Sequence, residues 1–326
     1  MTEAVTWSQA ELMTKVARLS AEQGMRQAEI GRRLNLSQAS VSRLLSRARD
    51  AGILRVHVVP PHGVHADVED ELQRRFGLDD VVVVDAAPPG VDAASDLGAR
   101  AAEYLQATLG GEGAIGVSSW STTLLAAAAT MGPPQPAAKA HRSRVVVQLV
   151  GGHGDPQVQA QAVRLLILLA QATRGEPMSL PAPGVLGSAP ARDALMADRA
   201  LEPILNSWAQ VTVALVGIGS VDPSPLVRDS GNAWGPADRQ ELASAGAVGD
   251  ICFRFFDASG NPVSSALDER VVGISLDDFR RIPRRVGVAG GLHKVPAIRG
   301  ALSGGLLTTL VTDTDTARAI LDEGRV

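Results

Sequence analysis

The part of the chain after Gly77 repeats one pattern, and this pattern limits the fold more than any other feature of the sequence. A short run rich in Val or Ile is followed by a loop of small residues and then by a helical stretch. Such alternation predicts a mostly parallel β-sheet covered by helices, a Rossmann-like α/β domain that binds ligands at the carboxyl ends of its strands. The expected strands are Val81–Asp85, Ala114–Ser118, Arg144–Val150, Val211–Ile218, Ile251–Phe256, Arg285–Ala289 and Leu307–Thr312.

A length of 326 residues, with 45% apolar and 20% charged side chains, suits two globular domains, one small and one large. The single cysteine, Cys252, excludes an internal disulfide and a metal held by paired thiolates, and we expect it in the core. The first residues have no signal-peptide pattern, and no apolar run approaches the roughly 18 residues of a membrane span. We therefore expect a cytoplasmic protein with no membrane partner.

Charge is distributed unevenly along the chain, whose formal net charge is −4. Residues 1–60 contain nine Lys or Arg against five acidic residues, so this segment is +4 and the remainder is −8. A cationic segment beside an acidic body is typical of a nucleic-acid module joined to a separate domain. A chance excess of basic residues on a solvated face would give the same count. Charge alone therefore does not establish nucleic-acid binding, and a sequence motif is needed to distinguish the two interpretations.

Three helices are expected within this cationic segment. The first covers Ser8–Gln23, because Ser8 and Glu11 have the spacing of a capping box and Gly24 can end the helix. The two that follow are Gln27–Leu34 and Gln38–Ala51.

The connection between the second and third helices has the features of a helix-turn-helix. Gly31 is the small residue needed where the helices cross, and Asn35 tolerates the positive φ of the turn. Ser37 can cap the third helix. The seam between the helices is expected to contain Ile30, Leu34, Leu36, Val41, Leu44 and Leu45.

The outward side chains of the third helix suit the edges of DNA bases. Gln can bridge adenine, Arg can bridge guanine, and Ser or Ala can approach thymine methyl groups, while nearby arginines contact phosphates. Any three-helix unit has a seam and a polar outer face, but here seam, turn, cap and basic face coincide. We expect contacts with double-stranded operator DNA from Arg32, Arg33, Ser37, Gln38, Ala39, Ser42, Arg43 and Arg47.

A linker is expected between the two domains. Ile53–Val59 alternates partly like a strand and could form a wing, and Val64–Phe76 has helical spacing after Pro60 and Pro61. The predicted domains are 1–59 for the DNA reader, 60–76 for a linker helix and 77–326 for ligand binding and oligomerisation. No acid or cysteine has metal spacing to the histidines of this region, so we expect no metal at His57, His62 and His65.

Several loops at the ends of expected strands carry groups suited to an oxygen-rich ligand. Ser118–Thr123 is a cluster of hydroxyls before a helix whose first amides could hold an anion. Gly151–Gly154 and Ala289–Lys294 follow other strands, and Lys294 at a helix start can meet a phosphate or carboxylate. Each loop taken alone is more often a structural turn or a helix cap, so the prediction depends on their combination.

The motifs of several enzyme classes are missing from the sequence. There is no GxxxxGK[ST], no GxGxxG with an acid about 20 residues downstream, and no GxSxG. These absences argue against nucleoside triphosphates, dinucleotides and an α/β-hydrolase mechanism. No base, nucleophile and orienting group can be assigned from spacing, so we expect neither an enzyme nor a cofactor.

Stretches from most of the chain together resemble the SorC family of bacterial sugar-responsive transcription regulators. The resemblance implies a tetrameric repressor or activator whose ligand domain is similar to sugar-phosphate isomerases and binds phosphorylated sugars or related compounds. The matching stretches are Gln27–Gly52, Phe76–Val84, Ile115–Ser118, Val145–Gly154, Val216–Gly219, Gly249–Asp257, Val272–Asp278 and Val286–Leu302.

The resemblance also implies roles for single residues. Thr122 and Thr123 look like a phosphate-holding pair, Lys294 like a second phosphate contact and Arg228 like a further basic contact, while Gln157, Gln161 and Asp257 are expected to face the sugar. The full set of expected ligand contacts is Ser119, Ser121, Thr122, Thr123, Gly151, Gly152, His153, Gln157, Gln161, Arg228, Asp257 and Lys294.

One departure from the family pattern bears on the ligand. Some relatives have a lysine or arginine directly before the Gly-Gly pair, where this chain has Val150. A covalent imine is excluded there, and Trp120 and His153 also differ from the common pattern. The ligand could therefore be a sugar phosphate, an uncharged sugar or a polyol.

Two other functions stay open on the sequence. One is a sugar-phosphate isomerase-like enzyme with a DNA-binding appendage, which turnover of a sugar phosphate would reveal. The other is a DNA-binding protein that responds to no ligand, which unchanged operator affinity across a metabolite panel would support.

Overall fold

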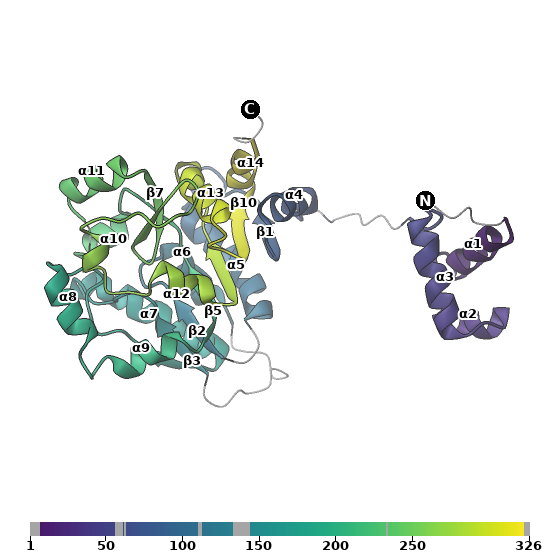
Figure 1. The fold of residues 1–326 in the computed structure, drawn as a ribbon, viewed down its shortest axis with the longest axis horizontal. Helices are drawn as coiled ribbons and strands as arrows, with labels where there is room; N and C mark the ends of the chain where they lie inside the picture. The colour runs from purple at the N-terminus through teal and green to yellow at the C-terminus, as the bar shows by residue number, and fades with distance from the viewer. Residues whose placement is uncertain are drawn as a thin grey trace. The chain divides into compact units, whose positions relative to one another are not determined.

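The structure is a computed structural model that describes residues 7–55, 61, 63–109, 113–132, 144–232 and 234–322. The chain divides into two compact units, an N-terminal unit, Met1–Pro61, and a C-terminal unit, His62–Val326. Among the described residues no helix is both long and apolar enough to cross a membrane. Figure 1 follows the chain through both units.

The N-terminal unit contains the predicted helix-turn-helix. Asn35 ends its second helix in the left-handed region with φ +53°, and the backbone of Leu36 lies so close that a Cβ on Gly31 would be 2.6 Å from its carbonyl oxygen. Ser37 caps the third helix by accepting the N–H of Ser40. The helices are α1 (Trp7–Ala21), α2 (Gln27–Leu34) and α3 (Gln38–Asp50).

The apolar seam forms as predicted. Ile30 and Val41 are fully buried, and Leu45 is nearly so. Leu34, Leu36 and Leu44 pack against them, together with residues of α1 such as Val16 and Leu19.

Two predictions for this unit differ from the structure. Helix α1 already contains Trp7 and Ser8, so Ser8 is not its N-cap and the predicted capping box is wrong. The described part of the expected wing, residues 53–55, is a bend rather than a strand, because the chain turns at Gly52 with φ +70°. The rest of that segment, with His57, lies outside the described residues, as does His62.

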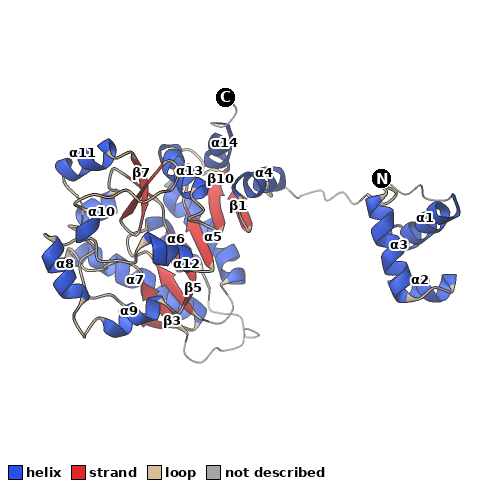
Figure 2. Ribbon diagram, viewed as in Figure 1, coloured by secondary structure: helices blue, strands red, loops and turns tan. Residues whose placement is uncertain are grey.

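The C-terminal unit is built on a seven-stranded sheet in which every neighbouring pair is parallel. Figure 2 shows these strands in the interior of the unit, with helices around them. The order across the sheet is β1 (Asp80–Val84), β10 (Thr309–Asp313), β9 (Arg284–Val288), β5 (Val211–Val216), β2 (Ala114–Val117), β3 (Val145–Gln148) and β4 (Glu176–Met178).

Successive strand residues enter two different apolar clusters, because side chains alternate across a sheet. Ile115 and Val213 pack on the face that α5, α6 and α7 cover, whereas Ala114 and Ala214 belong to the larger cluster on the other face. The helices of the unit are α4 (Ala66–Phe76), α5 (Ala93–Thr108), α6 (Thr122–Thr130), α7 (Pro156–Thr173), α8 (Ala189–Met196), α9 (Glu202–Trp208), α10 (Pro225–Asp229), α11 (Pro236–Ser244), α12 (Leu276–Arg281), α13 (Val295–Ser303) and α14 (Thr314–Asp322), with 3₁₀ turns η1 (Asp268–Arg270) and η2 (Leu292–Lys294).

One predicted strand is wrong, because its residues form part of a second, antiparallel sheet. Ile251–Phe256 is not a single strand, because the chain reverses at Cys252 and Phe253, which have φ +54° and +63°. Cys252 is buried as expected, but in this turn. The sheet contains β6 (Gly219–Ser220), β7 (Ala247–Ile251) and β8 (Arg254–Asp257), in that order.

Helix α4 is not a separate linker. Its Leu72 is fully buried, and the helix packs against β1 within the core of the C-terminal unit. The predicted linker segment 60–76 therefore contains a helix that is part of the C-terminal unit, since its apolar face needs that core.

Candidate functional site

The order in which successive strands are added reverses at the centre of the parallel sheet. β2 and β5 are neighbours, but β3 and β4 continue from β2 on one side, while β9 and β10 continue from β5 on the other. The loops after β2 and β5 therefore diverge, which leaves a crevice at their carboxyl ends. The Gly217 N–H, after β5, donates to Ser118 Oγ, after β2, at 3.1 Å and joins the two loops.

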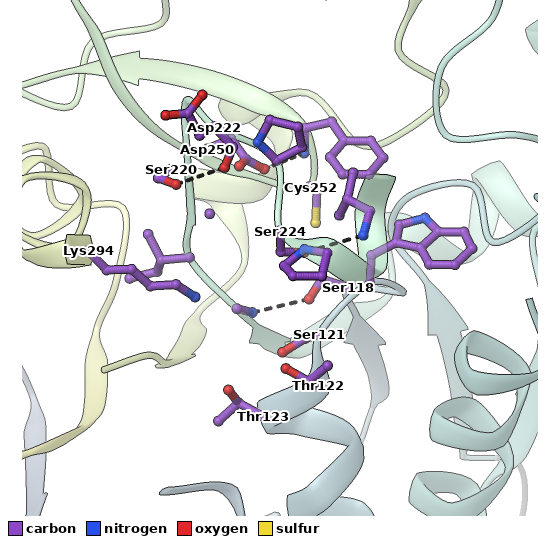
Figure 3. Close-up of a pocket in the computed structure, with 18 of the residues that line it drawn as sticks. Ser118, Ser121, Thr122, Thr123, Ser220, Asp222, Ser224, Asp250, Cys252 and Lys294 are labelled. Carbon is purple, nitrogen blue, oxygen red and sulfur yellow. Dashed lines mark hydrogen bonds between the residues drawn. The ribbon is translucent and has the colours of Figure 1, made fainter. Parts of the chain in front are cut away.

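A cavity of about 300 Å³ lies at this switch point, and we call it the switch-point cavity. Figure 3 shows Ser121, Thr122 and Thr123 on one side of it, Lys294 on another, and Asp250 and Asp222 at its far end. Its polar lining residues are Ser118, Ser121, Thr122, Thr123, Ser220, Asp222, Ser224, Asp250, His293 and Lys294.

The first turn of α6 presents unused hydrogen-bond donors to the cavity. Ser121 caps the helix by accepting the Leu124 N–H, which leaves the backbone N–H groups of Thr122 and Thr123 without an acceptor among the described residues. The side chains of both threonines line the cavity as well. Amides and hydroxyls at a helix N-terminus form a site suited to an anion.

Lys294 reaches the cavity from the loop after β9. Gly291 has φ +103°, and the chain then forms the 3₁₀ turn η2 that ends at Lys294. The lysine is partly buried, and within the described residues its ammonium has no hydrogen-bond or ion-pair partner within 4.0 Å. Loss of solvent lowers the pKa of Lys294, and the nearby Asp250 carboxylate opposes that shift.

Asp250, on β7, supplies the cavity with a buried carboxylate. It is 6% exposed, and one of its oxygens accepts the Phe253 N–H at 2.9 Å. Burial raises the pKa of Asp250 to about 6, although the Phe253 N–H and the charge of Lys294 both lower it. Its other oxygen faces Gly219, where a Cβ would lie 1.9 Å away. The side chain can accept a hydrogen bond from a ligand.

Apolar side chains line the remaining wall of the cavity. Trp234 meets the rings of Phe253 and Phe255 edge to face, with centroids 5.6 and 5.0 Å apart, which fixes its position. Trp120 is held by its indole N–H, which donates to the Gly151 carbonyl. The cavity therefore combines an end with unpaired hydrogen-bond donors, an end with a buried carboxylate and an apolar wall, a combination suited to a phosphorylated polyhydroxy compound.

The predicted DNA-contacting residues lie together on the N-terminal unit. All of them are exposed, and most are on α3 or its cap. Arg43 donates to Ser40 Oγ at 3.3 Å and Arg47 to Gln9 Oε1 at 3.4 Å, both uncharged acceptors, and neither guanidinium forms an ion pair with another described residue. The two arginines on α2 are Arg32 and Arg33.

Comparison with known proteins decides the family. Residues 62–322 match the family model of a sugar-binding domain. The chain is 34% identical over 314 residues to the deoxyribonucleoside regulator of Bacillus subtilis, covering 96% of this chain and 98% of that protein. It is 30% identical over 317 residues to the sorbitol operon regulator of Klebsiella pneumoniae, covering 95% and 97%. The chain belongs to the SorC family. It is a transcription regulator.

A solved SorC-family structure has the same architecture. The full-length sorbitol operon regulator of Klebsiella pneumoniae matches with a TM-score of 0.70 and 27% identity, covering 96% of this chain and 99% of that one. The match includes both the helix-turn-helix unit and the parallel α/β unit that we predicted.

Four of the ligand residues predicted for this SorC-family chain line one cavity. Ser121, Thr122, Thr123 and Lys294 come from two loops that are far apart in sequence.

The other predicted ligand residues lie outside the lining of the cavity. Ser119 is buried and donates to the Val150 carbonyl. Gly151 and Gly152 allow close packing, since a Cβ would lie 2.3 Å from the Pro183 oxygen at the first and 2.5 Å from Gln148 Nε2 at the second.

The remaining five occupy surface or turn positions. Arg228 is exposed and donates to the Pro223 carbonyl, so it supports the loop that lines the cavity. Asp257 accepts the Ser259 and Asn261 N–H groups in the turn after β8. Three of the five, His153, Gln157 and Gln161, are exposed and lie on α7 or before it.

Sequence reasoning missed several cavity residues. Asp250 lies on β7 of the small sheet, and no local motif connects it with the loops after β2 and β9. The hydroxyls and carboxylate that follow β5 could have been found, because a polar run with prolines after a strand predicts a loop at its carboxyl end. These residues are Ser220, Asp222 and Ser224.

Proposed function

We propose that this regulator binds operator DNA through α3 and that a phosphorylated sugar or polyol in the switch-point cavity controls this binding. One observation carries the proposal: the unpaired ammonium of Lys294 faces a cavity that the free N–H groups of Thr122 and Thr123 also enter. A partly buried cation and a helix N-terminus together favour a dianion.

The phosphoryl group would lie between α6 and Lys294. Its oxygens would accept the two backbone N–H groups, the threonine hydroxyls and the ammonium. The hydroxyls of the sugar would then reach Asp250, whose carboxylate accepts hydrogen bonds, while the apolar face of the carbon chain would lie against Trp120 and Trp234. Each part of such a ligand meets a complementary part of the cavity.

We further propose that the cavity binds its ligand without turnover. Burial raises the pKa of the Cys252 thiol, so the residue is not a thiolate nucleophile at neutral pH. Val150 stands where an imine-forming lysine would otherwise reach the cavity. The relatives described above are regulators, which supports binding as the purpose of the site.

Operator recognition also calls for more than one copy of the chain. A helix-turn-helix places one helix in the major groove and reads a short half-site, so such proteins bind as symmetric oligomers. We propose a cytoplasmic homo-oligomer, a tetramer, in which the ligand changes the spacing of the N-terminal units. A ligand can do this only if it binds the two arrangements unequally.

A thermal-shift screen tests the ligand class. Matched pairs are used: glucose and glucose 6-phosphate, ribose and ribose 5-phosphate, sorbitol and sorbitol 6-phosphate. We expect only phosphorylated members to raise the melting temperature, and Lys294→Gln to weaken the best one roughly tenfold, since it removes a charged hydrogen bond. Arg164→Gln, an exposed arginine on α7, is the matched control and should bind as the wild type does. Equal shifts from both members of a pair, retained in Lys294→Gln, would contradict the phosphoryl site.

A second experiment tests the DNA contact. Duplexes selected from a random library with the wild-type protein serve as operator, and affinity is measured by fluorescence anisotropy. Arg43→Ala should weaken binding roughly tenfold or more, because a bidentate contact with guanine is lost. Arg18→Ala, an exposed arginine of α1 paired with Glu22, should have little effect. Similar losses in the two variants would assign recognition elsewhere.

A further inference from the structure

The loop that carries Lys294 is fastened to the start of α14. The Gly291 N–H donates to Thr316 Oγ1 at 2.7 Å and to Asp313 Oδ2 at 3.1 Å. The Thr316 hydroxyl in turn donates to Asp313 Oδ2 at 2.8 Å, and the Thr316 N–H donates to Asp313 Oδ1, also at 2.8 Å. We call this closed set of bonds the α14 latch.

The backbone of the loop that carries Lys294 approaches the α14 latch closely at Gly290. A Cβ on Gly290 would lie 2.1 Å from Asp313 Oδ2, so only glycine lets the backbone approach the carboxylate this closely. Thr316 is fully buried, which excludes water as a competing partner. Gly291 then accepts the Lys294 N–H at 2.9 Å, so the bonded residue is also the one on which η2 is built.

This geometry differs from an ordinary helix cap. Asp313 Oδ1, which accepts the Thr316 N–H, is sufficient to cap α14. Its second oxygen and the threonine hydroxyl are directed instead at a loop from the neighbouring strand. Thr314 lies in the same turn and bonds elsewhere, to the Ala86 N–H after β1. Of these two buried threonines, Thr316 is the one whose hydroxyl is hydrogen-bonded to the loop of Lys294.

We propose that Asp313 and Thr316 are positioning residues for Lys294, holding its loop so that the ammonium is directed into the switch-point cavity before a ligand arrives. The inference rests on the proposed phosphoryl site. A lysine side chain has four rotatable bonds, and a loop that ordered only on binding would add its own entropy cost to the binding free energy. A loop that the α14 latch already holds loses its conformational entropy during folding, so ligand binding does not have to supply that free energy.

The experiment measures the affinity of the full chain for inorganic phosphate by calorimetric titration. Thr316→Val keeps the size of the side chain but removes both hydroxyl bonds of the latch. We expect it to weaken phosphate binding about fivefold. Thr316→Ser, which restores the hydroxyl, should recover most of the affinity. Thr316→Ala replaces Thr316→Val if the latter does not fold.

The matched control is Thr314→Val, which removes one hydrogen bond from the same turn of α14. It should lower the melting temperature as Thr316→Val does, yet leave phosphate affinity unchanged. Equal losses of affinity in both valine variants would overturn the proposal, because they would point to general weakening of α14.

A double-mutant cycle separates positioning from stability. In a Lys294→Gln background, Thr316→Val should cost no further affinity, because the group that it positions is already gone. An undiminished fivefold loss in that background would overturn the role of the latch while leaving the phosphoryl site intact. If Lys294→Gln itself binds phosphate as the wild type does, the proposed site fails, and the positioning role fails with it.

Discussion

Asp250 is a carboxylate in a place where solvent barely reaches, next to a lysine that is itself partly buried. Burial raises its pKa to about 6, so it changes charge within the range of ordinary assay buffers. Its unfolded pKa is close to 3.8. Between these two values the folded state binds more protons than the unfolded state, so this group favours folding at low pH and its contribution is lost as the pH rises through about 6.

The variant Asp250→Asn should remove this pH dependence while keeping an oxygen that can accept the Phe253 N–H. Relative to the wild type, its free energy of unfolding should rise from pH 4 to pH 6 by on the order of 3 kcal/mol and then level off. Urea denaturation at a series of pH values measures the difference. A difference that stays constant across the series would mean that Asp250 titrates in the folded protein as it does in the unfolded one.

Single residues also mark how far the sequence alone could locate the cavity. Thr122, Thr123 and Lys294 were predictable because hydroxyls and a lysine at helix starts, directly after strands, are local patterns. Asp250 was not, because β7 belongs to another sheet and only the tertiary fold brings it to the cavity. Gly151 and Gly152 looked equally promising, yet they make room for neighbouring atoms, which no local pattern distinguishes from a ligand loop.

At the scale of elements, the contact between α5 and α6 positions the first turn of α6, where we propose that the phosphoryl group binds. A Cβ on Gly98 of α5 would lie 2.2 Å from the Thr123 carbonyl oxygen, so the glycine sets how closely α5 approaches the start of α6. Backbone atoms cannot swing aside as a side chain can. Thr122 and Thr123 can therefore keep their positions only because residue 98 has no Cβ.

Gly98→Ala should displace the first turn of α6, which lowers the free energy of unfolding by about 2 kcal/mol and weakens phosphate binding. Thermal melts and phosphate titrations measure the two effects. The matched control is Gly187→Ala, where a Cβ would meet nothing within 4 Å and the φ is not positive. Wild-type phosphate affinity in Gly98→Ala would show that the turn is positioned by other contacts.

Elements show the same division between what could be predicted and what could not. Val-rich parallel strands are recognisable one at a time, because each is buried on both faces. The hairpin of β7 and β8 was hidden, since Cys252 and Phe253 adopt positive φ without being glycine. That turn is closed by a local bond, from the Phe253 N–H to Asp250, and by the packing of Phe253 against Trp234, a tertiary contact that leaves no trace in the local sequence.

At the scale of the molecule, the two units have separate cores. Val16, Ile30 and Val41 form one apolar cluster in the N-terminal unit, while the clusters that enclose the parallel sheet contain only residues of the C-terminal unit, as far as the described residues extend. We therefore expect each unit to unfold cooperatively around its own core.

Scanning calorimetry should resolve two unfolding transitions. A phosphorylated ligand at 100 times its dissociation constant should stabilise the C-terminal unit by about 2.7 kcal/mol and leave the other transition where it was. The isolated segment 62–326 should reproduce the ligand-sensitive transition. A single transition in the full chain that moves as a whole with ligand would mean that the two units unfold together.

The pairing of β1 with β10 has a consequence for the order in which a ribosome produces a working regulator. The three helices of the N-terminal unit are complete early in synthesis and can fold at once. β1 pairs along its whole length with a strand near the other end of the chain, and the α14 latch is made after that strand. A nascent chain therefore acquires its DNA-binding surface well before its cavity. A product that stopped short of β10 would retain the proposed DNA-binding surface but lack the partner strand of β1 and the α14 latch, on which the proposed ligand site depends.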